Sequence, residues 1–171
     1  MKIKDIIIDI VIVAVIVAVF SVFIKPIIVD GESMEPTLRN RDYLFLSRQA
    51  YHVGEPKRGQ IVVFPVGEDQ LYIKRVVALP GETVAVHDGR VFVNGKEQDQ
   101  SFTKEGTTID GINGKNSITV PKGQLFVMGD NRNHSEDSRF IGCINIKDVT
   151  GVVIVRLWPL KHIGTLEKQL Q

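Results

Sequence analysis

A serine, a lysine and a long polar loop are the residues of this chain that could perform chemistry together. Ser33 lies in the segment Gly31–Leu38, which reads Gly-Glu-Ser-Met-Glu-Pro-Thr-Leu, and Lys74 lies within the apolar run Leu71–Leu79. A serine hydroxyl is a weak nucleophile, and it attacks a carbonyl group only when a neighbouring base accepts its proton. These residue types therefore suggest serine-based hydrolysis, and the open question is which side chain supplies the base.

Lys74 is the first candidate base. A free lysine has a pKa of about 10.4, so only about one in 2,500 is neutral at pH 7. Burial among apolar groups lowers the pKa enough to correct this. The run around Lys74 is almost entirely apolar, with Leu71, Ile73, Val76, Val77, Ala78 and Leu79. The same pattern also fits a lysine that faces solvent and pairs with a carboxylate, so both interpretations stay open.

His134 is the second candidate base. It belongs to the loop Gly129–Arg139, in which all eleven residues are glycine or polar. Asp and Asn side chains stabilise tight turns by bonding to their own backbone, but eleven such residues are long for a turn. We expect a folded, hydrogen-bonded loop that lies against another part of the protein. A third alternative is that Ser33 is an ordinary loop residue.

An apolar segment precedes these residues and is long enough to cross a membrane. Ile6–Ile24 contains 17 apolar residues in 19 positions, the exceptions being Asp9 and Ser21. As a helix it would be about 28 Å long, close to the hydrocarbon thickness of about 30 Å. Pro26 is expected to end this helix. A buried core helix is the alternative, but no second element of matching length exists to bury it.

A retained anchor is expected here rather than a cleaved signal peptide. The apolar region of a cleaved signal has about 7–15 residues and ends in a small-x-small site, whereas Val22, Phe23 and Ile24 are bulky. Lys2 and Lys4 precede the run, which favours a cytoplasmic N-terminus. We therefore predict a cytoplasmic tail at 1–5, a single-pass anchor at 6–24 in the cell membrane, and an extracytoplasmic domain at 25–171.

The domain after the anchor is predicted to be mainly β. Short runs rich in Val, Ile and Phe alternate with turn signals such as Pro80-Gly81 and Asp88-Gly89, a pattern typical of antiparallel strands. The expected fold is an antiparallel β-sheet forming a partly closed, barrel-like domain. Residues 98–117 are polar and Gly-rich and are predicted to form an exposed insertion. The predicted strands are Tyr43–Leu46, Gln60–Phe64, Leu71–Leu79, Thr83–Val86, Val91–Val93, Gln124–Met128 and Thr150–Trp158.

Composition argues against several classes of function. With 21 basic and 20 acidic residues the net charge is +1, so no nucleic-acid-binding surface is indicated. The single cysteine, Cys143, excludes an intramolecular disulfide and is interpreted as a small buried hydrophobic residue. The four histidines show no metal-ligand spacing, and no cofactor or metal is expected.

Four segments, in this order, resemble the sequence blocks of type I signal peptidases. They are Gly31–Leu38, Arg58–Phe64, Tyr72–Glu82 and Gly129–Gly142, and they follow an N-terminal anchor. The resemblance covers most of Ile6–Pro159 and leaves 98–117 unmatched. The single short anchor is similar to the Gram-positive form of the family.

The resemblance implies a membrane-bound serine endopeptidase that removes signal peptides from exported preproteins after small residues. It makes Ser33 the nucleophile and Lys74 the general base, with Ser135 orienting the lysine and Asp137 and Arg139 as a supporting pair. Expected partners are preprotein signal peptides and membrane lipid, with the secretion machinery as a further partner.

The oxyanion hole and the substrate pockets follow from the same resemblance. The Ser33 backbone N–H is the expected oxyanion donor, whereas Gly31 stands where some relatives carry a serine whose hydroxyl is the second donor. Apolar residues near the site are expected to form shallow pockets for an extended substrate. They are Ile27, Ile28, Val29, Met34, Tyr72 and Ile73.

Two other functions were considered. A self-cleaving repressor-type Ser–Lys protease would need a DNA-binding helical domain upstream, and none fits in residues 1–25. A membrane-tethered β domain without catalytic activity, such as a scaffold or pseudoenzyme, is the remaining alternative. The intact pair of Ser33 and Lys74 argues against it.

Overall fold

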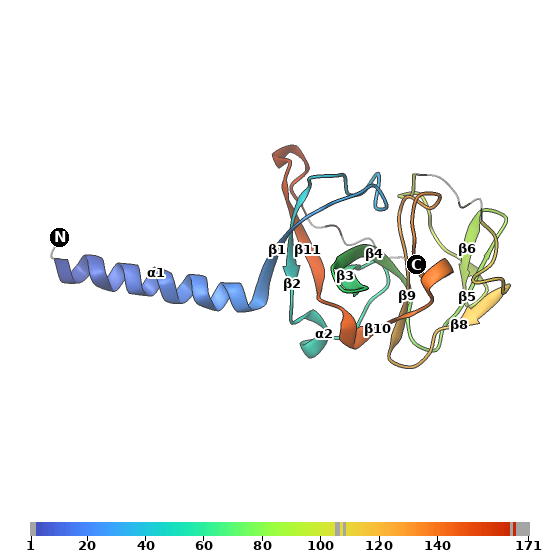
Figure 1. Ribbon diagram of the computed structural model, residues 1–171, viewed down its shortest axis with the longest axis horizontal. Helices are drawn as coiled ribbons and strands as arrows, with labels where there is room; N and C mark the ends of the chain where they lie inside the picture. The colour runs from blue at the N-terminus through green and yellow to red at the C-terminus, as the bar shows by residue number, and fades with distance from the viewer. Residues whose placement is uncertain (1–2, 105–106, 108, 165, 167–171) are drawn as a thin grey trace.

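A long apolar helix extends from one end of a β-rich domain (Figure 1). The computed structural model describes residues 3–104, 107, 109–164 and 166. Within them one helix, α1 (Ile3–Phe23), is long and apolar enough to span a membrane, with a mean hydropathy of 3.2. It ends one residue earlier than expected, because Ile24 pairs with Ser47 and begins strand β1 (Ile24–Ile28). Pro26 has no N–H for a helix and disfavours helical geometry at Lys25, so the chain leaves the helix here.

The larger sheet is antiparallel throughout and has seven strands in the order β1-β2-β11-β3-β4-β9-β10. It confirms the prediction of a mainly β, antiparallel fold. Between its end strands β1 and β10 no pairing is found among the described residues, so barrel-like closure is not confirmed. The other strands are β2 (Tyr43–Ser47), β3 (Ile61–Val66), β4 (Gln70–Ala78), β9 (Gln124–Met128), β10 (Ile144–Asn145) and β11 (Gly151–Trp158).

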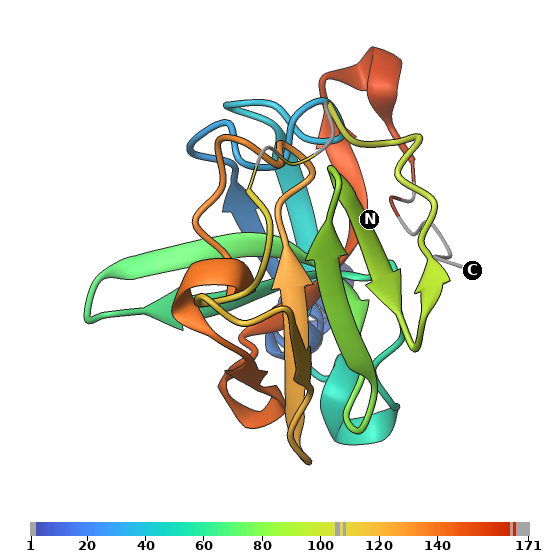
Figure 2. The same cartoon turned by 90° about the vertical axis from the view of Figure 1, so that its right-hand side faces the viewer.

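A smaller, four-stranded antiparallel sheet lies at the end of the domain away from α1 (Figures 1 and 2). Its first hairpin turns at Asp88 and Gly89, which both have positive φ angles as a tight two-residue turn requires. Its strands are β5 (Thr83–His87), β6 (Arg90–Val93), β7 (Lys96–Glu97) and β8 (Ser117–Thr119), in the order β7-β6-β5-β8. The short helices are α2 (Ala50–Val53), α3 (Ser138–Ile141), η1 (Ile146–Asp148) and η2 (Leu160–His162).

The seven strands predicted from sequence are all present, with ends that differ by at most two residues. Four further strands, β1, β7, β8 and β10, were missed. Three of them have only two or three residues, too few for an alternating pattern to be visible. The fourth, β1, contains Pro26, which is normally confined to sheet edges, and β1 is an edge strand.

The prediction that residues 98–117 form an exposed insertion is wrong for part of this segment. Gln98, Phe102, Thr107 and Ile112 are buried. Phe102 packs 4.5 Å beneath the guanidinium of Arg75, so the segment covers a buried charge rather than extending into solvent. Cys143 is half-buried, and burial raises the pKa of its thiol.

Candidate active site

Ser33 lies on the irregular segment between β1 and β2, which is fixed from two directions. On the core side of the segment, Met34 and Leu38 are almost fully buried between β2 and β3. Asn131 fixes the backbone of the same segment: its N–H donates to the Ser33 carbonyl (3.0 Å) and its side-chain amide donates to the Glu32 carbonyl (3.1 Å). The position of the hydroxyl is therefore set by the core and by the loop Gly129–Arg139.

Lys74 projects from β4 toward Ser33. Its Nζ lies 2.8 Å from Ser33 Oγ, within hydrogen-bond distance. The lysine is only 3% exposed, and the ring of Tyr72 lies 4.8 Å from Nζ. Of the two interpretations left open by the sequence, the structure has the buried lysine, not the solvent-facing one.

Burial lowers the pKa of Lys74 to about 8. Loss of hydration disfavours the charged ammonium and is the largest cause. The negative charges of Asp137, Glu136 and Asp130 oppose the shift, while Arg139 adds to it. The lowered pKa leaves about a tenth of the lysine neutral at pH 7.

The loop Gly129–Arg139 is a folded hydrogen-bonded structure, as expected. Asp137 is its centre: its carboxylate accepts from the Ser135 hydroxyl (2.7 Å), from the Gly129 N–H (3.0 Å) and from Arg139 Nε and Nη2 (both 2.9 Å). Both members of the Asp137–Arg139 pair are fully buried. Because the Ser135 hydroxyl donates to Asp137 here, its orienting role toward Lys74 stays a prediction.

Gly129 allows this loop to approach Ser33 closely. A Cβ at this position would lie 2.5 Å from the Ser33 carbonyl oxygen and would collide with Ser135 Oγ. Any side chain would therefore separate the loop from the serine. No other glycine shows contacts as close as these, within the part of the chain that the structure describes.

A second buried ion pair, between Arg75 and Asp130, was not assigned a role from sequence. Arg75 Nε and Nη2 donate to the two carboxylate oxygens at 2.8 and 2.6 Å, and Nη1 donates to the Gly59 carbonyl (2.8 Å). The pair joins β4 to the loop Gly129–Arg139. Arg75 follows Lys74 in the sequence, and Asp130 precedes Asn131. A charged residue inside an otherwise apolar strand was the available signal, since buried arginine requires a partner.

A surface cleft of about 610 Å³ opens in front of the two residues. Every residue expected to form the substrate pockets lines it: Ile27, Ile28, Val29, Met34, Tyr72 and Ile73. Val29, Met34 and Ile73 are buried and form its floor, whereas Ile28 is half exposed. Gly31 also lines the cleft and, having no side chain, offers no hydroxyl there.

His134 lies at the rim of the same cleft and is exposed. The hydrogen bond to Ser33 Oγ comes from Lys74, not from this histidine. Its neighbour Glu136 accepts a hydrogen bond from the Tyr72 hydroxyl (2.6 Å), which raises the pKa of Tyr72. Among the described residues no group of three His, Cys, Asp or Glu side chains could hold a metal ion.

A serine and a buried lysine thus lie together in a cleft of a mainly β domain. Comparison with known protein families agrees with this arrangement. Residues 3–158 match the family model described as signal peptidase, peptidase S26. The chain therefore belongs to the signal peptidase family, peptidase S26, and the resemblance to type I signal peptidases is confirmed.

Individual relatives agree with the family match. Signal peptidase I P of Bacillus subtilis subsp. natto is 40% identical over 147 residues, covering 81% of this chain and 80% of the relative. Signal peptidase IB of Staphylococcus aureus (strain COL) is 34% identical over 154 residues, covering 81% and 80%. A crystal structure of a signal peptidase I from Enterococcus faecalis V583 is similar with a TM-score of 0.50 and 35% identity, covering 58% of this chain and 97% of that one. The chain is accordingly a peptidase.

Proposed function

We propose that this protein is a membrane-bound signal peptidase I in which Ser33 is the nucleophile and Lys74 the general base. The observation that carries the proposal is the 2.8 Å contact between Ser33 Oγ and the Nζ of a lysine that is 3% exposed. A nucleophile within hydrogen-bond distance of a base whose pKa is near the working pH is the arrangement that nucleophilic catalysis requires.

The reaction runs through an acyl-enzyme. Neutral Lys74 accepts the Ser33 proton as Oγ attacks the scissile carbonyl, and the Ser33 N–H donates to the developing oxyanion. Protonated Lys74 then gives its proton to the leaving amine, and water hydrolyses the ester. Because Gly31 provides no hydroxyl, a second oxyanion donor would have to be another backbone N–H or a water molecule.

Ser135, Asp137 and Arg139 support the dyad in this proposal. Arg139 neutralises Asp137 through two charge-assisted hydrogen bonds, and Asp137 fixes Ser135. The fixed loop excludes water from Lys74, and the resulting loss of hydration lowers the pKa of the lysine.

The substrate would lie extended along the edge strand β1, opposite Tyr72 and Ile73. Sheet edges offer unpaired backbone groups to which a peptide can add as a further strand. The shallow floor formed by Val29, Met34 and Ile73 suits small side chains before the cut, such as those of an Ala-x-Ala site, in agreement with the expected cleavage after small residues.

Membrane placement follows from α1. We propose that it spans the cell membrane with its N-terminus in the cytoplasm, so that the β domain and its cleft lie outside, where exported preproteins emerge. The apolar side chains that the structure describes along α1 are exposed, and a bilayer would cover them.

Cleavage of a preprotein with an Ala-x-Ala site tests the dyad. Detergent-solubilised wild type, Ser33→Ala, Lys74→Ala and His134→Ala would be compared, with the cut positions mapped by mass spectrometry. We expect the first two variants to be inactive and His134→Ala to be active. Activity in Lys74→Ala with loss in His134→Ala would show a histidine base instead. An inactive wild type would favour a dedicated substrate or the non-catalytic tethered domain.

A further inference from the structure

A second cavity lies on another side of the domain, away from Ser33 and Lys74. Its volume is about 610 Å³, equal to that of the substrate cleft, with which it shares no lining residue. It is bounded by the end of β2, helix α2, the turn before β9, the segment β10–η1 and the start of β11. Nothing in the proposed reaction uses it.

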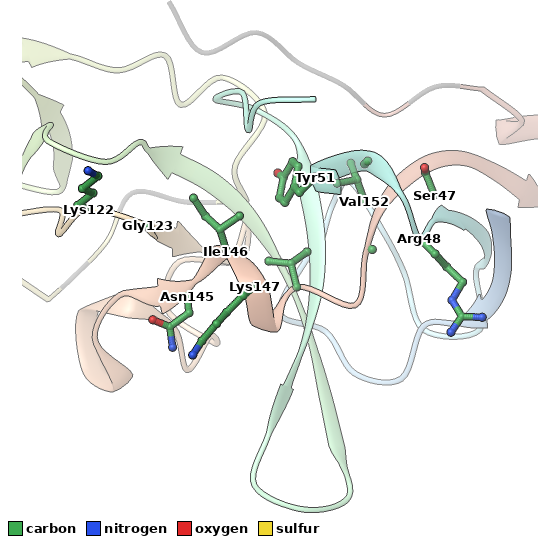
Figure 3. Close-up of a pocket in the computed structure, with 12 residues that line it drawn as sticks. Ser47, Arg48, Tyr51, Lys122, Gly123, Asn145, Ile146, Lys147 and Val152 are labelled. Atoms are coloured by element: carbon green, nitrogen blue, oxygen red, sulfur yellow. The ribbon is translucent and has the colours of Figure 1, made fainter. Parts of the chain in front are cut away.

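The cavity has an apolar wall. Ala50, Tyr51, Ile146 and Val149 line it and pack with their other faces against the core between β3, β4 and β9. Figure 3 shows Tyr51, Ile146 and Val152 in its middle. Such a wall suits the glycerol and upper acyl carbons of a lipid better than a fully polar solute.

Its rim is basic. Arg48, Lys122 and Lys147 line the cavity, and none of its twelve described lining residues is acidic. Arg48 and Lys122 lie at opposite ends in Figure 3. All three side chains are exposed, and none takes part in an ion pair found among the described residues. The nearby Asp148 accepts from Asn145 (2.8 Å) and is outside the lining. The site therefore favours an anion.

The cavity adjoins the end of the apolar helix. The Arg48 N–H donates to the carbonyl of Phe23, the last residue of α1 (2.9 Å), and Ser47 pairs with Ile24. Figure 1 shows α2, which forms part of the cavity, at the end of β2, the strand that pairs with β1. If α1 crosses the bilayer, Arg48 lies at the level of the lipid headgroups.

We propose that this cavity binds the headgroup of an anionic phospholipid from the leaflet in which α1 ends. Basic pockets next to membrane helices bind anionic headgroups through the phosphate charge, and here an apolar wall completes an amphipathic site. Bound lipid would fix how the domain, and with it the cleft, sits on the membrane surface. The proposal rests on the membrane placement proposed above and not on the Ser33–Lys74 chemistry.

Lipid retention by the full-length chain tests the proposal. The protein would be purified in a non-ionic detergent and titrated with short-chain phosphatidylglycerol or phosphatidylcholine, with bound lipid counted by native mass spectrometry. Variants would carry Arg48→Gln, Lys122→Gln and Lys147→Gln singly and together. The matched control would carry Lys25→Gln, Arg90→Gln and Lys161→Gln, which lie outside the cavity.

We expect wild type to prefer phosphatidylglycerol, and each single change in the cavity to weaken its binding about fivefold. The control triple variant should bind as wild type does. Three results would overturn the proposal. Equal loss of phosphatidylglycerol binding in both triple variants would attribute the binding to general surface charge. Equal binding of the two lipids by wild type, or complete displacement of phosphatidylglycerol by soluble glycerol phosphate, would exclude a site for an anionic phospholipid. Ser33→Ala should bind lipid normally, which separates this result from failure of the catalytic proposal.

Discussion

At the scale of single residues, the site depends on one lysine being buried next to one serine. Lys74 is neutral in a useful fraction only because its surroundings exclude water, and its Nζ reaches Ser33 because β4 and the Ser33 segment are both fixed by the core. The same burial has consequences for the pH dependence of activity and for stability.

Activity should rise with pH until Lys74 is deprotonated. With a pKa of about 8, kcat/KM is expected to fall about tenfold per pH unit below that value, because only the neutral lysine accepts the serine proton. A pH–rate profile on a peptide substrate measures this. A profile without this acid limb would contradict Lys74 as the general base.

Lys74→Met should abolish cleavage without lowering stability. Because the pKa of Lys74 is lowered in the folded state, the unfolded chain binds more protons between pH 8 and 10.5, and stability rises with pH across that window. Methionine removes this cost, so we expect the free energy of unfolding at pH 7 to be unchanged or about 1–3 kcal/mol higher. Denaturant titration of both proteins checks it; a large loss of stability would mean that Lys74 is not desolvated as described.

Glu136→Gln should move the acid limb to lower pH. Four charged groups shift the pKa of Lys74, and of these only Glu136 is exposed. The other three are Asp137, Arg139 and Asp130. Removing the negative charge of Glu136 lowers the lysine pKa further. Asp69→Asn is the matched control, because this exposed carboxylate lines the same cleft without acting on Lys74. Identical shifts in both variants would contradict the assignment.

At the scale of elements, the proposed active site is a junction between β4, the Ser33 segment and the loop after β9. The buried Arg75–Asp130 ion pair and the contacts of Asn131 hold these pieces together, while the buried Asp137–Arg139 pair fixes the loop internally. Changes that separate the pieces should therefore reduce activity even when no catalytic group is altered.

Gly129→Ala tests this junction. The added Cβ would push the loop away from the Ser33 carbonyl, and misplacement by about 1 Å typically costs about a hundredfold in kcat. Gly54→Ala, in the C-terminal cap of α2, is a control, because Gly54 has an extended backbone and does not line the cleft, and its added Cβ would meet the Ala50 carbonyl oxygen at 3.2 Å. Steady-state kinetics would show the difference, and near-wild-type kcat in Gly129→Ala would mean that the loop yields without moving Ser33.

Asp130→Asn should destabilise the domain by about 3–5 kcal/mol, because it leaves the buried guanidinium of Arg75 without its counter-ion. Thermal unfolding in detergent measures the loss. The double variant Arg75→Met/Asp130→Leu removes both charges and should recover much of it, whereas a double variant as unstable as the single one would show that the pair matters for another reason.

At the scale of the whole molecule, α1 contacts strand β1, and the Arg48 N–H donates to the Phe23 carbonyl at the end of the helix. Deleting residues 1–22 should therefore leave the domain folded and active on short peptides, while cleavage of preproteins held in vesicles falls steeply. Comparing both substrates for the full and shortened chains measures this. Equal activity on vesicle-bound preprotein would argue against the anchoring role of α1.

The sequence by itself determined the apolar helix, seven of the eleven described strands and the candidate residues. The apolar length of α1 and the alternating runs of the long strands were sufficient, since these patterns depend on local spacing. Sequence blocks in order around Ser33, Lys74 and Asp137 indicated the family, although β1, with its proline, and the two- and three-residue strands were missed.

Only the tertiary structure decided how the candidates meet. Whether Lys74 was buried or solvent-facing depended on packing between β3, β4 and the loop after β9, which no local pattern encodes. The burial of Phe102 under Arg75 and the basic cavity around Arg48, Lys122 and Lys147 also join residues far apart in the chain. Contacts of this kind arise from the folding of the whole domain, because burial and charge environment are properties of neighbours in space rather than in sequence.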